Sequence, residues 1–519
     1  MSEDLTRRRL FGLAGATAAG AAGLSASGCS VLHLGSTTTN VRAVAAYSAG
    51  PPFRTRPHLT PPHITIRRTG IGSTSRYIFL NAPYSGPGHG GTYIIDPHGH
   101  FVWFGPNTAS EHRLNFSVQS YNGQPVLTWF EGLVVAGFGE GDFVIADQHY
   151  KEIHRVKAVG NQLADFHEFT LTPRGTAYIP IYRRHSPVNL TSRGGPANGY
   201  ILSGVAQEID IATGHKVWEW DSWAASNPHV PLSESHQGFG GGDAGHGTHA
   251  SPWNYFHINS ICDVADGTDD VLISGRNTFC VYRVHKPTGH IVWRLGGRRN
   301  DFTYGSPRAR FYWQHHVRPL PVGSRPFGAM TVFDNGVPHE AYSRALLLKV
   351  MQNTAGTGGR VELTKAFVHP HAVYQSGAMG SAQLLPDGRM FVGWGTEPHF
   401  SEFAANGTLL LDGDIIKGDP SYRAFSQDWV GHPTDKPAAA ARYRTGGATV
   451  YASWNGATEV RFWVVLAGHT AGNLHQLVKA HKSGFETAIN VSNRGPYFAV
   501  HALDAKGNVL AQSAPVKIR

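Results

Sequence analysis

GHFVW at residues 99–103, GHKVW at residues 214–218 and GHIVW at residues 289–293 repeat one short pattern along the chain. Each copy follows an apolar run that ends in a turn. A strand, a turn containing Gly, and a second strand ending in Trp are typical of one blade of a β-propeller. We therefore predict a propeller in which the blade cores are filled by Trp103, Trp218 and Trp293.

The composition agrees with an all-β fold. Of the 519 residues, 41% are hydrophobic and only 16% are charged, against about 25% charged in an average globular protein. Coiled coils and long solvated helices are therefore excluded. The 62 Gly and 31 Pro residues indicate many tight turns between short strands.

Changes of pattern along the chain suggest its domain boundaries. We expect a Pro-rich lead-in over residues 29–62 and the propeller over residues 63–430. The break at residues 431–437 is followed by short alternating strands. Residues 438–519 are therefore expected to form a small C-terminal β-sandwich of immunoglobulin or fibronectin size.

The N-terminus has the layout of a twin-arginine export signal. Arg7, Arg8 and Arg9 precede an uncharged Ala/Gly-rich run that ends at Gly28, a weakly apolar segment that is a poor membrane span. We predict a signal over residues 1–28, recognition by the twin-arginine export machinery, and a location in the cell envelope or outside the cell. Cys29 follows small residues and is a candidate lipid anchor.

Charge and cysteine content exclude two further classes. The net charge of +9 is scattered rather than gathered into a stripe, so we expect no nucleic-acid partner. Cys262 and Cys280 fall on the strands either side of a third strand, about 10 Å apart by strand spacing. This separation is too wide for a disulfide, and we expect free structural thiols.

Chemically capable side chains occur in four separate segments. His167 lies in DFHEF, His257 in FHINS, Arg276 in ISGRN and His315 in WQHHV. Because the inner strands of a propeller line one central channel, these side chains are expected to converge there. Histidines could bind a metal ion, or histidines and an arginine could bind a tetrahedral oxyanion. A guanidinium repels a divalent cation but matches sulfate or phosphate oxygens, so we predict an anion site without metal or cofactor.

In these segments the chain resembles the arylsulfotransferase family. The resemblance covers roughly residues 45–430. The matching segments are residues 139–150, 165–169, 257–260, 274–276, 289–297, 314–315 and 333–336. It implies a six-bladed propeller that moves a sulfuryl group from a phenolic sulfate donor to a phenol acceptor, without a nucleotide donor. The C-terminal text at 453–458 and 484–487 is similar to the small domain that often follows.

The resemblance also implies roles for individual residues. His315 would be the nucleophile that is transiently sulfated, while His257 and Arg276 would hold sulfuryl oxygens. His167 would assist the phenolic leaving group or the oxyanion, and Asn259 would contact the substrate site and steady His257 through a hydrogen bond. His316 follows His315 directly and would point to the opposite face of its strand.

Other interpretations of the sequence remain open. The chain could be a non-catalytic exported propeller that binds an anionic or carbohydrate ligand of the cell envelope, or a propeller enzyme that depends on a metal or quinone. The text Asp334-Asn335-Gly336 is typical of a tight turn, and we predict a turn there rather than part of the site.

Overall fold

The computed structural model describes residues 52–519 except for 69–75, 84–88, 109, 224–228, 241–242, 265, 321–327, 337 and 417–419. The predicted export signal over residues 1–28 and the candidate lipid anchor at Cys29 lie outside the described residues. In the described part, regular structure consists of β-strands and short 3-10 helices, so the predicted all-β class is confirmed. None of the helices described there is long and apolar enough to cross a membrane.

Six sheets of four or five strands follow one another between residues 63 and 427. The first two contain β5 (His112–Tyr121), β6 (Gln124–Val135), β7 (Phe138–Ala146) and β8 (Glu152–Val156), then β9 (Thr170–Leu171), β10 (Thr176–Val188), β11 (Gly199–Asp210) and β12 (Lys216–Asp221), with β13 (Trp253–Asn254) beside β11. The third contains β14 (Ile258–Asp263), β15 (Asp270–Gly275), β16 (Cys280–His285) and β17 (Ile291–Gly296).

The other three sheets complete this region. The fourth contains β19 (His315–Pro319), β20 (Ala329–Asp334), β21 (Arg344–Gln352), β22 (Gly359–Phe367) and β18 (Phe302–Tyr304), and the fifth contains β23 (Ser381–Leu384), β24 (Met390–Gly393), β25 (His399–Phe403), β26 (Leu409–Ile416) and β1 (His63–Arg68). The sixth joins β27 (Phe425–Gln427) to β2 (Tyr77–Ala82), β3 (Gly91–Ile95) and β4 (Phe101–Pro106). The 3-10 helices are η1 (Thr191–Arg193), η2 (Leu232–Glu234), η3 (Arg276–Thr278) and η4 (Pro307–Ala309).

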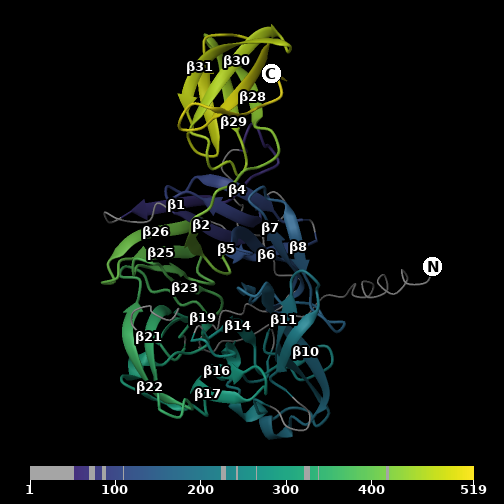
Figure 1. The fold of residues 1–519 in the computed structure, drawn as a ribbon, viewed down its shortest axis with the longest axis vertical. Coiled ribbons are helices and arrows are strands. Elements are labelled where there is room, and N and C mark those ends of the chain that lie inside the picture. The colour runs from purple at the N-terminus through teal and green to yellow at the C-terminus, as the bar shows by residue number, and fades with distance from the viewer. Residues whose placement is uncertain are drawn as a thin grey trace, which may run out of the picture. The chain divides into compact units, whose positions relative to one another are not determined.

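The six sheets contact one another in a closed ring through their inner edge strands and, in the second sheet, through β10 beside β9. β5 contacts β9, β10 contacts β14, β14 contacts β19, β19 contacts β23, β23 contacts β27, and β27 contacts β5. The two ends of the region close the ring by antiparallel pairing, with β1 on β26 and β2 on β27. Figure 1 shows β1, in purple, alongside β26, in green. Residues far apart in sequence are thereby brought to one centre.

The three GHxVW stretches occupy equivalent hairpins. Gly99, Gly214 and Gly289 have φ values of 88°, 72° and 71°, which a residue without a Cβ adopts without strain. Each hairpin also carries an irregularity of register next to the residue that pairs with the Trp. Trp103 and Trp293 are buried as predicted. Trp218 is only half-buried, because Trp220 occupies the core position on β12.

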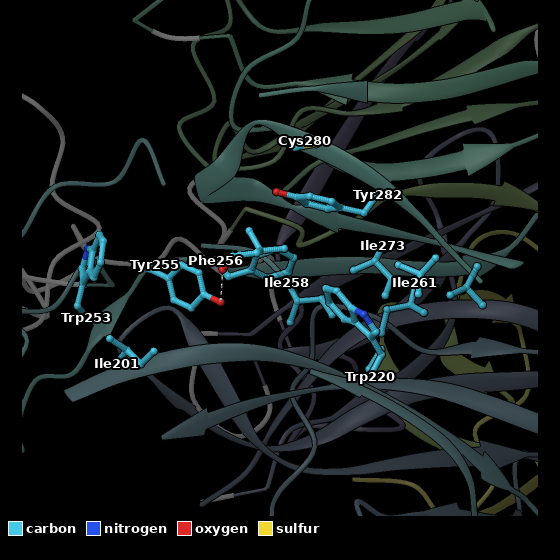
Figure 2. Packing of buried hydrophobic residues seen from close by; sticks show 14 of the residues in the cluster. Ile201, Trp220, Trp253, Tyr255, Phe256, Ile258, Ile261, Ile273, Cys280 and Tyr282 are labelled. Atoms are coloured by element: carbon cyan, nitrogen blue, oxygen red, sulfur yellow. Dashed lines mark hydrogen bonds between the residues drawn. The ribbon is translucent and has the colours of Figure 1, made fainter. Parts of the chain in front are cut away.

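A dense apolar cluster lies between the β9–β12 sheet and the β14–β17 sheet. Figure 2 shows Tyr255, Phe256 and Ile258 packed in this cluster together with Trp220 and Ile273. Phe256 and Ile258 are both fully buried and flank His257 in the chain. Packing of its two neighbours therefore holds the backbone of His257 in place.

Two further sheets follow the ring. The first contains β28 (Ala438–Arg444), β29 (Gly447–Ser453) and β32 (Glu486–Val491), and the second contains β30 (Phe462–Thr470), β31 (Asn473–His481), β33 (Tyr497–Leu503), β34 (Val509–Gln512) and β35 (Val516–Lys517). Both sheets contribute to one buried cluster that includes Val450 and Trp463. The strand β28 was not predicted, because its Ala-rich sequence has few of the β-branched and aromatic residues that are typical of strands.

The cysteine prediction is confirmed for the described residues. Cys262 on β14 and Cys280 on β16 are free and buried. They lie on either side of β15, where Cys262 pairs with Leu272 and Cys280 pairs with Gly275. Burial raises the pKa of the Cys262 thiol to about 12, so this side chain is a packing group rather than a reactive thiolate.

Candidate functional site

Three histidines stand at the start of the ring strands of three successive sheets. His167 lies shortly before β9, His257 immediately precedes β14, and His315 is the first residue of β19. Two of these positions have unusual backbones. His257 has a φ of 56° and Trp313, two residues before His315, has a φ of 54°. Left-handed conformations at bulky residues cost about 1–3 kcal/mol and are concentrated at functional sites.

The structure brings these three imidazoles together. One ring nitrogen from each of His167, His257 and His315 lies within 4.8 Å of the others. The Nε2 atoms of His167 and His257 are 3.2 Å apart, and the rings of His167 and His315 stack with centroids 6.3 Å apart. All three side chains are buried. The convergence that the sequence predicted for these residues is therefore present.

Asp165 orients His167. Its Oδ1 accepts a hydrogen bond from His167 Nδ1 at 2.6 Å and another from the His167 backbone N–H at 2.8 Å. The other oxygen, Oδ2, accepts from the backbone N–H of Gly139 at 2.5 Å. With the proton of neutral His167 on Nδ1, its Nε2 presents a lone pair to the centre.

Asn254 orients His257. The side-chain Nδ2 of Asn254 donates to His257 Nδ1 at 2.8 Å, so the proton of the neutral ring is on Nε2 and faces His167. Burial, followed by the nearby His167 and Arg276, lowers the pKa of His257 well below its ordinary value. His257 is therefore a neutral donor at the centre.

Asn335 and Met379 set the state of His315. The Asn335 amide donates to the carbonyls of Ser376 and Met379 at 2.9 and 3.1 Å, which leaves its Oδ1 to accept from His315 Nδ1 at 2.7 Å. The Met379 backbone N–H donates to His315 Nε2 at 3.2 Å. Burial, followed by Arg276 and His167, lowers the pKa of His315 well below its ordinary value. His315 thus carries its proton on Nδ1, and its unprotonated Nε2 accepts the Met379 N–H, a hydrogen bond that this nitrogen would have to give up in order to act as a nucleophile.

His316 points away from this group. Its Nδ1 lies 3.2 Å from the carbonyl of Ala382, and its ring packs near Phe425. A register irregularity between His315 and Arg318 separates the two histidines. Of this pair, His315 is the one that joins His167 and His257.

Arg276 supplies a buried cation beside the histidines. It begins η3, and its backbone N–H donates to the carbonyl of His257 at 2.9 Å. Its guanidinium lies 4.7 Å from the ring centre of Trp313 and donates to the carbonyl of Gly377 at 3.0 Å. Asp243 is 3.5 Å away. Among the described residues, Arg276 Nε has no hydrogen-bond partner, so the guanidinium retains capacity for an anion.

The hydrogen bond expected between Asn259 and His257 is not formed. Asn259 Nδ2 donates instead to the carbonyl of Gln314 at 2.7 Å and ties β14 to the chain just before β19. Asn254, three residues before His257, takes the expected role. The positive φ of His257 turns the ring back toward Asn254, and the sequence alone does not reveal this turn.

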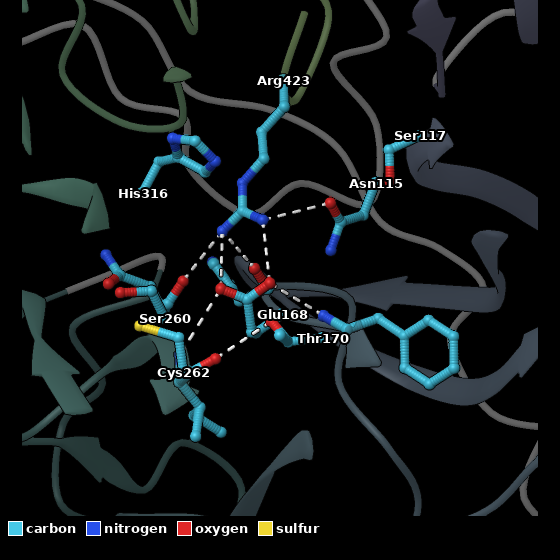
Figure 3. A network of polar contacts seen from close by, with 12 residues as sticks. Asn115, Ser117, Glu168, Thr170, Ser260, Cys262, His316 and Arg423 are labelled. Carbon is cyan, nitrogen blue, oxygen red and sulfur yellow. Dashed lines mark hydrogen bonds and ion pairs between the residues drawn. The ribbon is translucent and has the colours of Figure 1, made fainter. Parts of the chain in front are cut away.

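Beneath the histidines lies a buried ionic network. Glu168 Oε1 accepts from Arg423 at 3.0 Å and Glu168 also pairs with Arg318 at 2.8 Å. Figure 3 shows Arg423 reaching Glu168 and Asn115, with His316 nearby. Burial alone would raise the pKa of Glu168, but the charges of Arg318 and Arg423 overcome it and lower that pKa. The network joins residues of four sheets or of the chain next to them, and Arg423 also donates to the backbone carbonyl of His167 at 2.8 Å.

Half-buried aromatic side chains adjoin the histidines. The Tyr182 ring is 5.5 Å from that of His257 and stacks on Phe138 at 5.2 Å. The Trp313 ring lies under Arg276 and meets Phe279 edge-on at 4.6 Å. Aromatic walls around a few polar groups are typical of sites for small organic ligands.

The donor set was also tested against a metal ion. Three imidazoles are a known zinc ligand set, but tetrahedral zinc requires ligand nitrogens about 3.4 Å apart, whereas the set here spreads to 4.8 Å. Arg276 contributes to the lowered pKa of both His257 and His315, and the same positive charge opposes a cation. The three imidazoles are a candidate set of metal ligands, and the neighbouring guanidinium of Arg276 favours an anion instead.

Three residues of the site were missed by sequence reasoning. Asp165 and Asn254 lie within three residues of their histidines, and Asn335 was interpreted as part of a turn. For Asp165 and Asn335 the signal was present, because both lie in segments that carry the family resemblance. Their contacts depend on side-chain direction, which residue spacing does not define.

Comparison with known proteins gives one family. The family model described as Arylsulfotransferase (ASST) matches residues 117–416, a range that contains all three histidines and Arg276. No curated protein is significantly similar to the chain.

Several solved structures share part of the chain's shape at low identity. Apo AztD from Citrobacter koseri is 11% identical, with a TM-score of 0.30, and the match covers 69% of this chain and 100% of that one. A catalytically inactive virginiamycin B lyase from Staphylococcus aureus is 8% identical, with a TM-score of 0.29 and coverage of 76% and 97%. A streptogramin B lyase is 10% identical, with a TM-score of 0.26 and coverage of 68% and 98%.

Proposed function

The chain belongs to the arylsulfotransferase family, a family of sulfotransferase enzymes, and from this membership we propose that it moves a sulfuryl group from a phenolic sulfate ester to a phenol. The observation that supports the proposal is the convergence of His167, His257 and His315 beside the buried cation of Arg276. In a sulfate ester the sulfuryl oxygens share one negative charge, and three imidazoles beside a guanidinium suit such a group.

The proposed reaction has two steps through His315. The Nε2 lone pair of His315 attacks sulfur, the bond from sulfur to the aryl oxygen breaks, and the first phenol leaves. A second phenol then attacks the sulfated His315 and regenerates it. Arg276 holds sulfuryl oxygens, His257 exchanges its Nε2–H hydrogen bond to His167 for one to a sulfuryl oxygen when the donor binds, and His167 then assists the aryl oxygen. Asn335 supports the ring by accepting from Nδ1.

The proposed fold around this site is a six-bladed propeller with a C-terminal sandwich. Six sheets joined in a closed ring support the first part, and two sheets around one core support the second. The aromatic rings of Tyr182 and Trp313 provide walls against which the aryl groups would pack.

The proposed location is the cell envelope or the exterior. The support is the sequence alone, namely Arg7, Arg8 and Arg9 before a short Ala/Gly-rich run. Recognition by the twin-arginine export machinery follows from the same residues, and Cys29 is a candidate for lipid attachment.

One experiment tests the proposed activity. Purified protein is mixed with 4-nitrophenyl sulfate and a phenol, and release of 4-nitrophenol and sulfation of the phenol are followed. We expect both to occur, and we expect mass spectrometry to find a sulfo group on His315 after incubation with donor alone. His315→Asn should abolish both steps. The matched control is His316→Asn, which changes the adjacent buried imidazole outside the site.

Two outcomes would overturn the proposal. Full activity of His315→Asn would exclude His315 as nucleophile. No turnover by the intact chain with any of a panel of aryl sulfates would favour the alternative, a propeller that binds an anionic or carbohydrate ligand without converting it.

A further inference from the structure

Asp165, which orients His167, is a buried carboxylate within the site. It is completely buried, and a buried charge is costly unless it is paired. Among the described residues, no lysine or arginine forms an ion pair with it, and its one ionic partner is His167. Its sequence neighbour Glu168 is different, because Arg423 and Arg318 both neutralise it.

We propose that Asp165 is the positioning residue that makes His167, rather than His257, the proton carrier of sulfuryl transfer. This inference rests on the proposed function. The 2.6 Å contact from Asp165 Oδ1 to His167 Nδ1 fixes the ring so that Nε2 faces the centre. When the histidine pair takes up one further proton, the imidazolium of His167 is the form that neutralises Asp165.

The surroundings of the other two histidines favour the same choice. His257 accepts at Nδ1 from the neutral amide of Asn254, and His315 donates at Nδ1 to the neutral amide of Asn335. Neither has a carboxylate partner among the described residues. Arg276 adds positive charge near both rings, so a second positive charge is opposed there. His167 is the ring of the three that is matched to a negative group.

The proton and bond changes balance in both half-reactions. In the first, the bond from His315 Nε2 to sulfur forms and the bond from sulfur to the aryl oxygen breaks, with its electron pair moving to that oxygen. The oxygen takes the Nε2 proton of the His167 imidazolium, which becomes neutral. In the second, the acceptor phenol gives its proton to His167 Nε2 as its oxygen bonds to sulfur and the bond from sulfur to His315 breaks.

The test is the effect of Asp165→Asn on a series of leaving groups. Single-turnover release of phenol from aryl sulfates measures the first half-reaction alone. An acidic phenol such as 4-nitrophenol departs as the anion without a proton, whereas unsubstituted phenol, with a pKa near that of tyrosine at about 10, needs one. We expect Asp165→Asn to lower the single-turnover rate of phenol release about 100-fold with phenyl sulfate and less than about threefold with 4-nitrophenyl sulfate. The affinity for both substrates should be unchanged.

A purely structural role predicts a different pattern. Asp165 also accepts two backbone N–H groups, and general damage would slow every donor by the same factor. Equal losses across the series, or no loss with phenyl sulfate, would overturn the proposal. If Asp165→Asn does not fold, His167→Gln serves instead, since it keeps the backbone contacts of Asp165, and it must show the same selective loss.

A spectroscopic readout separates the charge effect from the kinetics. The short contact between Asp165 and His167 should give a strongly deshielded imidazole proton signal that is lost in Asp165→Asn, and persistence of that signal would count against the assignment. The proposed function is tested separately by sulfation of His315 in the intact chain with 4-nitrophenyl sulfate. If the Asp165 proposal fails, sulfation of His315 is still observed. If the proposed function fails, no sulfated His315 is found, so the two failures can be told apart.

Discussion

Replacement of Asn335 by Ala probes how the nucleophile is held. The Asn335 side chain accepts from His315 Nδ1 at 2.7 Å and donates to the Ser376 and Met379 carbonyls at 2.9 and 3.1 Å. Each buried hydrogen bond contributes about 1 kcal/mol net, so the loss of all three should lower the free energy of unfolding by about 3 kcal/mol. His315 would also lose its closest Nδ1 partner, which leaves the Trp313 carbonyl at 3.1 Å and the Met379 N–H at 3.2 Å to orient the ring.

The expected effect on activity is a fall of about 10- to 100-fold in the rate of His315 sulfation, the range found when groups that orient an active imidazole are removed. The assay is the burst of 4-nitrophenol on mixing with excess 4-nitrophenyl sulfate, combined with urea denaturation. Asn107→Ala is the matched control. That buried amide also donates to two carbonyls and accepts one backbone N–H, but it lies just after β4, away from the three histidines in the sequence.

The comparison of the two variants decides the interpretation. Both should lose a similar amount of stability, whereas only Asn335→Ala should lose the burst. A burst rate in Asn335→Ala within twofold of the intact chain would refute the reasoning that Asn335 sets the state of His315. An equal loss in Asn107→Ala would show that activity follows stability instead.

The remaining predictions concern charge. Asp243 lies 3.5 Å from Arg276, so Asp243→Asn should tighten inhibition by sulfate about three- to tenfold, after allowance for solvent screening, and an unchanged inhibition constant would contradict the anion site. Glu168→Gln leaves Arg423 buried without its carboxylate and should lower the free energy of unfolding, measured by urea denaturation, by about 3–5 kcal/mol. A decrease below about 1 kcal/mol would contradict a stabilising role for this ion pair. Because the folded pKa of Glu168 is lowered from 4.5, its contribution is present above that pH and is lost as the pH falls through the lowered value. The pKa of His315 lies well below 6.5, so the sulfation rate should not fall as the pH drops through 6.5, and a half-maximal rate at or above that pH would disagree. Chelation of metal ions should leave turnover unchanged, and its loss would favour a metal-dependent enzyme.

The all-β class, the repeated hairpins and the free cysteines could be predicted from short stretches of sequence. Gly99, Gly214 and Gly289 mark the hairpin turns, because their positive φ values favour a residue without a side chain. Trp218 shows the limit of this reasoning. The pattern that buries Trp103 and Trp293 was expected to bury it too, but Trp220 fills that core.

That the three histidines and Arg276 are candidate site residues could likewise be predicted, because each lies in a short polar segment next to an apolar segment typical of a strand. Their supporting residues could not all be assigned. Asn259 was expected to hold His257, but the left-handed backbone at His257 presents the ring to Asn254 instead. Backbone reversals of this kind depend on packing of Phe256 and Ile258 on both sides.

The sequence by itself determined which segments form strands, where the turns lie, and which residue types can bind a sulfuryl group. Those properties are local, since they depend on side-chain chemistry and on neighbours a few residues away. Tertiary structure decided which atoms face one another. Closure of the ring by β1 and β2 brings His167, His257 and His315 together over separations of up to 148 residues, and the partners Asp165, Asn254 and Asn335 then determine which nitrogen carries each proton.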